Sequence, residues 1–149
     1  MTDDEFMAMA FEEATKAGQR GEVPVGAALV SSDGRLIARD GNRIVERHDP
    51  TAHAEMIVLQ QASRLLGNER LLGTMLYVTL EPCAMCTGAI SLARVERLVF
   101  AADDPKGGAV LHGARFFELP TCHHRPIVAR AGDAAMVGEL LKDFFRARR

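Results

Sequence analysis

The chain has 149 residues, of which 48% are hydrophobic and 26% charged, a composition typical of a globular domain with its own core. A formal net charge of −2 argues against a protein that coats nucleic acid non-specifically, although a local basic patch can still bind phosphate. An acidic N-terminus, three cysteines and no long apolar run exclude a secretory signal, a disulfide framework and a membrane span, so we expect a cytoplasmic protein.

The N-terminal part of the chain predicts a helix followed by a hairpin. Thr2 and Glu5 fit a capping box, and the apolar residues that follow repeat at helical spacing. Gly18 then ends this helix. The apolar segments 25–30 and 36–40 flank a short turn sequence, which predicts a β-hairpin.

The middle of the chain predicts two further helices around a strand. Asp49 and Pro50 together are typical of a helix start, and Gly67 of a helix end. The apolar segment 75–80 is short enough to be a buried strand. Pro82 suits the first turn of the helix that follows.

The C-terminal part predicts two strands and a last helix. Residues 97–101 and 126–130 form the strands, and the glycine-rich segment 103–110 forms a loop. Asp133 caps a final helix with one apolar face. Helices alternate with strands after the hairpin and no repeat or linker divides the chain, so we expect a single α/β domain over residues 1–149, with a mixed sheet between helices.

Two of the cysteines form the motif 82-PCAMC-86. Cys83 and Cys86 lie at positions i and i+3 of the predicted helix, so both thiols point to the same side. The helix N-terminus favours thiolate over thiol. From this motif alone the pair could carry out redox chemistry, bind a metal or simply pack in the core.

The segment 53-HAE-55 favours the metal-site interpretation. His53 with two thiolates supplies three good zinc ligands and leaves the fourth tetrahedral position for water, whose pKa zinc lowers towards neutrality. Glu55 could then transfer protons, provided that it stays off the metal. Residues two apart point about 200° apart on an ideal helix, so His53 and Glu55 can share a site only at the end of the helix.

These motifs resemble those of the zinc-dependent nucleoside and nucleobase deaminases, which share an H-x-E…P-C-x-x-C pattern. Within that superfamily the chain is most similar to the bacterial tRNA adenosine deaminases. The similarity covers nearly the whole chain in order, in the segments 22-EVPVGA-27, 47-RHDPTAHAEM-56, 76-LYVTLEPCAMCTGAI-90, 105-PKGGA-109 and 143-DFFRARR-149. The resemblance implies a cytidine-deaminase-like, three-layer α/β/α fold with a five-stranded mixed sheet.

The same resemblance assigns the chemistry of the site. It implies one zinc ion per chain, held by His53, Cys83 and Cys86, with Glu55 as the proton shuttle. The implied reaction is the hydrolytic conversion of adenosine to inosine at the wobble position of a tRNA. An anticodon loop suits such an enzyme because its unpaired bases can be splayed into a pocket.

The resemblance also implies how substrate is bound. Asn42 is implied to contact the flipped purine, Val25 to line the pocket wall, and Asp104 to lie near the ribose. Backbone groups of Ala54 and Cys83 are implied to line the position of the nucleophilic water. The family further implies a homodimer that contacts RNA through both subunits, and phosphate contacts are expected from Lys106, Arg146, Arg148 and Arg149.

Two other functions share part of this pattern. A free nucleobase or nucleoside deaminase, acting on guanine, cytosine or adenosine, would use the same zinc residues, and the negative net charge favours it. A structural zinc module would close the fourth position with Cys122, His123 or His124, and would need no Glu55. The basic C-terminus has an alternative role as well, because arginines stabilise the C-terminal end of a helix.

Overall fold

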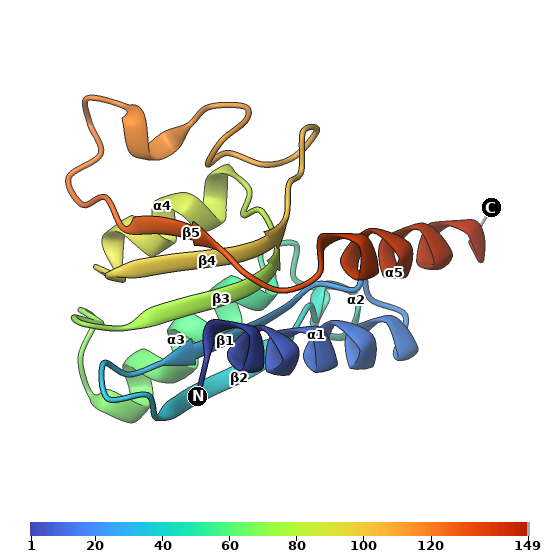
Figure 1. The fold of residues 1–149 in the computed structure, drawn as a ribbon, viewed down its shortest axis with the longest axis horizontal. Coiled ribbons are helices and arrows are strands. Elements are labelled where there is room, and N and C mark those ends of the chain that lie inside the picture. The colour runs from blue at the N-terminus through green and yellow to red at the C-terminus, as the bar shows by residue number, and fades with distance from the viewer. Residues whose placement is uncertain (149) are drawn as a thin grey trace.

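A five-stranded mixed sheet forms the middle layer of the fold (Figure 1). Its strands are β1 (Gly26–Val30), β2 (Leu36–Gly41), β3 (Met75–Leu80), β4 (Arg97–Ala102) and β5 (Ile127–Arg130). The strands are ordered β2-β1-β3-β4-β5, with β1 antiparallel to both neighbours and β3, β4 and β5 parallel. The structure is a computed structural model, and it describes residues 1–148.

Helices cover both faces of this sheet (Figure 1). They are α1 (Asp3–Gln19), α2 (Ile44–Arg47), α3 (Ala54–Leu66), α4 (Ala84–Leu92), α5 (Ala134–Arg146) and the short 3₁₀ helix η1 (Phe116–Glu118). α1 and α5 lie on one face, and α3 and α4 lie on the other. The predicted three-layer α/β/α fold is therefore confirmed. No helix among residues 1–148 is long and apolar enough to cross a membrane.

Alternation along the strands divides the core into two layers. Successive side chains of a strand point to opposite faces. In β3, Val78 packs with Val58 of α3 and Ile90 of α4, whereas its neighbour Tyr77 packs with Phe6 of α1. All five of these side chains are buried, and the burial of such apolar surface is the main force that holds the helices on the sheet.

The starts of α3 and α4 differ from the prediction. The expected start of α3 at Asp49-Pro50 is wrong, because the Asp49 carboxylate accepts hydrogen bonds from Thr51 N (2.8 Å) and Thr51 Oγ1 (2.7 Å) and closes a local turn instead. α3 begins only at Ala54 and has His53 as its N-cap. Pro82 likewise lies before α4 rather than in its first turn, since Cys83 is the N-cap of that helix.

Other predicted boundaries agree with the structure. Thr2 caps α1 by accepting a hydrogen bond from Glu5 N, and Asp133 caps α5 by accepting one from Met136 N. α1 runs one residue beyond Gly18. The hairpin of β1 and β2 and the strands β3, β4 and β5 lie where they were expected, whereas α2 and η1 were not predicted.

Candidate metal and catalytic site

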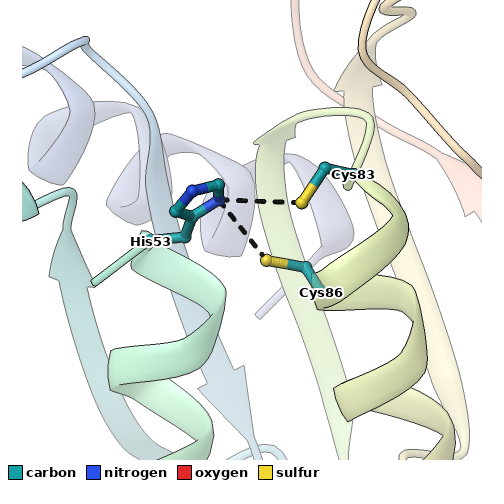
Figure 2. Close-up of side chains that lie close together, drawn as sticks. All are labelled: His53, Cys83 and Cys86. Atoms are coloured by element: carbon teal, nitrogen blue, oxygen red, sulfur yellow. Dashed lines mark hydrogen bonds between the residues drawn. The ribbon is translucent and has the colours of Figure 1, made fainter. Parts of the chain in front are cut away.

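Three potential metal ligands converge at the N-terminal ends of α3 and α4 (Figure 2). The Nδ1 atom of His53 lies 3.7 Å from Cys83 Sγ and 3.6 Å from Cys86 Sγ. All three ligand atoms lie within 4.8 Å of one another, and no other group of three such side chains converges in this way within residues 1–148.

The spacing of these atoms fits a tetrahedral zinc ion. Bonds of about 2.3 Å to sulfur and about 2.0 Å to nitrogen, at a tetrahedral angle, place sulfur and nitrogen about 3.5 Å apart. The observed separations of 3.6 and 3.7 Å match that value. One imidazole and two thiolates leave a fourth position for water or substrate. Cys122 belongs to a different cluster, because its sulfur lies 3.5 Å from Ser91 Oγ and donates to His124 O.

Backbone conformation at two helix starts aims these ligands at one point. His53 (φ −71°, ψ 150°) and Cys83 (φ −74°, ψ 178°) are both extended N-cap residues, and Cys86 lies in the first turn of α4. In an ideal helix, the side chains of His53 and Glu55 would point about 200° apart. Because His53 is the extended N-cap residue and lies outside the helix, this restriction does not apply to it. Both helix N-termini also direct positive partial charge at the site, which favours thiolates there.

The two thiols differ in acidity. The pKa of Cys83 is lowered to about 4, first because the Cys86 thiol donates a hydrogen bond to it and also because His53 does, although burial acts in the opposite direction. The same hydrogen bond, together with burial, raises the pKa of Cys86. The pKa of His53 is raised, chiefly by its hydrogen bond to Cys83. The lowered pKa of Cys83 favours its thiolate, which is the form that binds a metal.

Glu55 is a buried carboxylate beside these ligands. It is the second residue of α3, and only 4% of it is exposed. Burial raises its pKa to about 7, and the nearby Cys83 acts in the same direction, whereas a backbone hydrogen bond and His53 lower it. A carboxyl group with a pKa near the working pH can both accept and donate a proton, as a general acid–base catalyst must.

Asn42 joins the end of the hairpin to the start of α3. Its Oδ1 accepts a hydrogen bond from Ala54 N (2.8 Å), and its Nδ2 donates one to Val23 O (3.0 Å). Its own N–H donates to Val25 O (3.1 Å). Asn42 is thus hydrogen-bonded to both Val25 and Ala54, two other residues expected to meet substrate. Ala54 directly follows the metal ligand His53 in the chain.

Asp104 lies on a loop that runs past the metal site. Its carboxylate accepts hydrogen bonds from Lys106 N (3.2 Å) and Gly107 N (3.0 Å), so part of its bonding capacity is used within the loop. The loop is attached to the site, because Ala109 N donates to Pro82 O (2.9 Å), one residue before Cys83. The structure therefore brings the loop of Asp104 beside the metal ligands.

Two further buried glutamates, which hold loops and helix starts, were not predicted. Glu22 is 1% exposed and accepts hydrogen bonds from Val45 N and Glu46 N at the start of α2. The Glu81 side chain is fully buried and bonds the loop that carries Asp104. A glutamate directly after an apolar strand and directly before Pro82 is the signal that could have indicated a buried, extended residue.

A cavity of about 840 Å³ lies away from these residues, between α1 and α5. Its walls include Met7, Phe11 and Val137, which belong to the opposite face of the sheet from α3 and α4. None of the candidate site residues lines it, so its size says nothing about the chemistry at His53.

Comparison with known proteins identifies a zinc-binding deaminase family. Residues 1–102 match the family model of the cytidine and deoxycytidylate deaminase zinc-binding region. A relative from Agrobacterium fabrum, named tRNA-specific adenosine deaminase, is 56% identical over 144 residues, which cover 97% of this chain and 94% of the relative.

Two solved structures are similar in fold. One comes from a study of A-to-I editing by tRNA:A34 deaminases at the wobble position of transfer RNA; its TM-score is 0.89 at 56% identity, covering 92% of this chain and 99% of that one. A guanine deaminase from Bacillus subtilis has a TM-score of 0.66 at 37% identity, covering 69% of this chain and 66% of that one. The chain therefore belongs to the cytidine and deoxycytidylate deaminase family and, within it, to the tRNA-specific adenosine deaminases.

Proposed function

We propose that this protein hydrolyses adenosine to inosine at the wobble position of a tRNA and releases ammonia. The observation that carries the proposal is the pairing of an open three-ligand metal site with the buried Glu55, in a chain that matches tRNA-specific adenosine deaminases over nearly its whole length. Zinc, one ion per chain, fits the His53, Cys83 and Cys86 donor set and supplies a Lewis acid that makes water nucleophilic near neutral pH.

In this proposal Glu55 moves the protons of the reaction. Glu55 takes a proton from the attacking water and delivers it to N1 of the purine as a C6–O bond forms. It then carries the second proton of that water to the amino group, so that the C6–N bond breaks and ammonia leaves. Burial suits Glu55 to this role, because its pKa of about 7 lets it accept and return protons without a large cost in either direction.

The residues around Glu55 orient the base. We assign Val25 to the pocket wall and the second hydrogen of Asn42 Nδ2 to the purine, since its first already bonds Val23 O. Backbone groups of Ala54 and Cys83 line the position of the attacking water. Asp104 contacts the ribose of the same nucleotide or of a neighbouring one.

Cations on the loop and the last helix would contact the RNA backbone. Lys106 is exposed on the loop beside the site. Arg146 lies 3.5 Å from Asp143, and the guanidinium of Arg148 lies 3.5 Å from the centre of the Phe144 ring, so both also stabilise the end of α5. Arg149 lies outside the described residues. Phosphate contacts by these side chains would make binding weaker as salt rises.

The proposal includes a homodimer and a cytoplasmic location. A groove of about 500 Å³ between α3 and α4 is lined by Met56, Leu59 and Leu92, and Leu92 is 79% exposed. A second copy of the chain would cover this apolar surface. Sedimentation velocity tests the dimer, and Leu92→Glu is expected to yield monomers.

A cytoplasmic location follows from the tRNA substrate and from free thiols that need a reducing compartment.

The substrate is tested by product analysis. The purified protein is incubated with an anticodon stem-loop and, separately, with free adenosine, guanine and cytosine, and the products are identified by mass spectrometry. We expect inosine in the stem-loop and little or no turnover of the free compounds. The three-residue variant of Arg146, Arg148 and Arg149 to alanine should raise KM for the stem-loop, flatten its salt dependence and leave the zinc content unchanged.

A free-base deaminase is the second candidate, and the similarity to a guanine deaminase at 37% identity favours it. It would use the same metal ligands and the same Glu55. Efficient turnover of a free base with an inert stem-loop would overturn the RNA substrate and leave the deaminase chemistry in place. A salt dependence that persists in the triple variant would assign the arginines to the end of α5 alone.

A further inference from the structure

The carboxylate of Glu81 gathers an unusual number of hydrogen bonds. Its side chain is 0% exposed. Its Oε1 accepts a hydrogen bond from Asp104 N (3.0 Å) and lies 2.8 Å from His112 Nδ1. Its Oε2 accepts bonds from three successive backbone N–H groups, those of Val110 (3.1 Å), Leu111 (2.9 Å) and His112 (3.2 Å). One buried residue thus holds both ends of the loop segment 104–112.

The three successive N–H groups form a concavity of the kind that binds anions. A carboxylate offers about four lone-pair sites, so the donors around Glu81 fill its capacity. The glycine-rich loop therefore presents these amides to the protein's own carboxylate and not to a phosphate group. Gly108 makes the close approach possible, since a Cβ atom at this position would lie 2.5 Å from Glu81 Cδ and Oε2.

Glu81 also connects this loop to the metal site along the backbone. Only Pro82 separates it from Cys83 in sequence. Glu81 N donates to Ala102 O (2.8 Å), and Ala109 N donates to Pro82 O (2.9 Å). The loop and the start of α4 are therefore built as one unit, although Glu81 itself contributes no metal ligand.

We propose that Glu81 is a positioning residue for substrate binding, which fixes the loop of Asp104 and Lys106 at the edge of the metal site. This inference rests on the proposed function, because the loop is assigned there to the RNA. Glutamine at this position keeps the volume but turns an –NH2 group towards N–H donors. The loop should then open while the metal ligands stay in place.

Two variants disturb the attachment of the loop. Glu81→Gln does so from the residue after β3, and Gly108→Ala does so from the loop, where the added Cβ would lie 2.5 Å from the Glu81 carboxylate and 2.6 Å from Asp104 O. For both we expect KM for the anticodon stem-loop to rise about tenfold, kcat to stay within about threefold of wild type, and zinc content to be unchanged. Amide exchange of residues 103–113 should become at least about tenfold faster. Having both variants keeps the test valid if one of them fails to fold.

Asp3→Asn serves as the control for loss of stability alone. Asp3 accepts hydrogen bonds from Tyr77 Oη and Arg97 in the layer of α1, away from the metal ligands, so its loss should leave KM and loop exchange unchanged. Wild-type exchange rates in both Glu81→Gln and Gly108→Ala would overturn the claim that Glu81 holds the loop. Fast exchange with a wild-type KM would overturn its positioning role in substrate binding. If the stem-loop is inert even with wild-type protein, the proposed function fails, while the exchange rates still decide whether Glu81 holds the loop.

Discussion

Replacing Asn42 with alanine tests how the start of α3 is held. In the structure Ala54 N, which is fully buried at the first position of the helix, donates its hydrogen bond to Asn42 Oδ1 over 2.8 Å. His53, the N-cap, makes no capping bond with its own side chain. Alanine at position 42 would leave this N–H without its partner and would also remove the donor to Val23 O.

The expected cost follows from these two bonds. A buried N–H left without a partner costs about 1–3 kcal/mol, and loss of an ordinary hydrogen bond costs about 1 kcal/mol more. Asn42→Ala should therefore lower the free energy of unfolding by about 2–4 kcal/mol. Because Ala54 follows His53 directly, zinc affinity should fall as well, by about 10–100-fold, as for other residues that orient a metal ligand.

Urea unfolding of the zinc-free proteins measures the first quantity, since bound zinc would add the difference in zinc affinity to the measured stability by mass action. Competition with a chelator measures the second. Asn68→Ala is the matched control: its side chain also accepts a backbone hydrogen bond, from Arg70 N, but it is exposed, so we expect a change within about 0.5 kcal/mol. A loss below about 1 kcal/mol in Asn42→Ala would refute the argument that Asn42 caps α3.

Three further predictions concern the site and the fold. Glu55→Gln should keep zinc and fold but lower kcat by about 10²–10⁴-fold, measured by single-turnover kinetics, whereas loss of zinc would make Glu55 a ligand. Cys83→Ala should lose zinc and activity while Cys122→Ser keeps both, measured by elemental analysis; zinc loss in Cys122→Ser would contradict the open three-ligand site. Asp3→Asn should cost about 1 kcal/mol, a reduced figure because the Asp3 side chain is 35% exposed. Hydrogen bonding to Arg97 lowers the pKa of Asp3 from 3.8 to about 2. The extra stability of wild type over Asp3→Asn is therefore complete above pH 3.8 and is lost as the pH falls through about 2. Unfolding curves between pH 2 and 7 test this, and a difference that grows as pH falls would oppose it.

Local sequence patterns determine several secondary-structure elements of this protein and the residues of its candidate site. The hairpin of β1 and β2 follows from apolar segments on either side of a turn, and the starts of α1 and α5 follow from Thr2 and Asp133, whose side chains bond to N–H groups three residues on. The four residues of the chemistry, His53, Glu55, Cys83 and Cys86, stand in two short motifs whose donor types favour zinc. These features depend on neighbours within a few residues, so a sequence alone can indicate them.

Tertiary structure decided where those motifs lie relative to one another. The start of α3 was predicted too early because Asn42, twelve residues before Ala54, supplies the bond that sets it, and Asp49 uses its carboxylate in a turn of its own. Glu81 meets its partners 23 to 31 residues away, across the sheet and the loop. Hydrogen bonds over such separations form only after the sheet has brought distant segments together, and no local spacing in the chain encodes them.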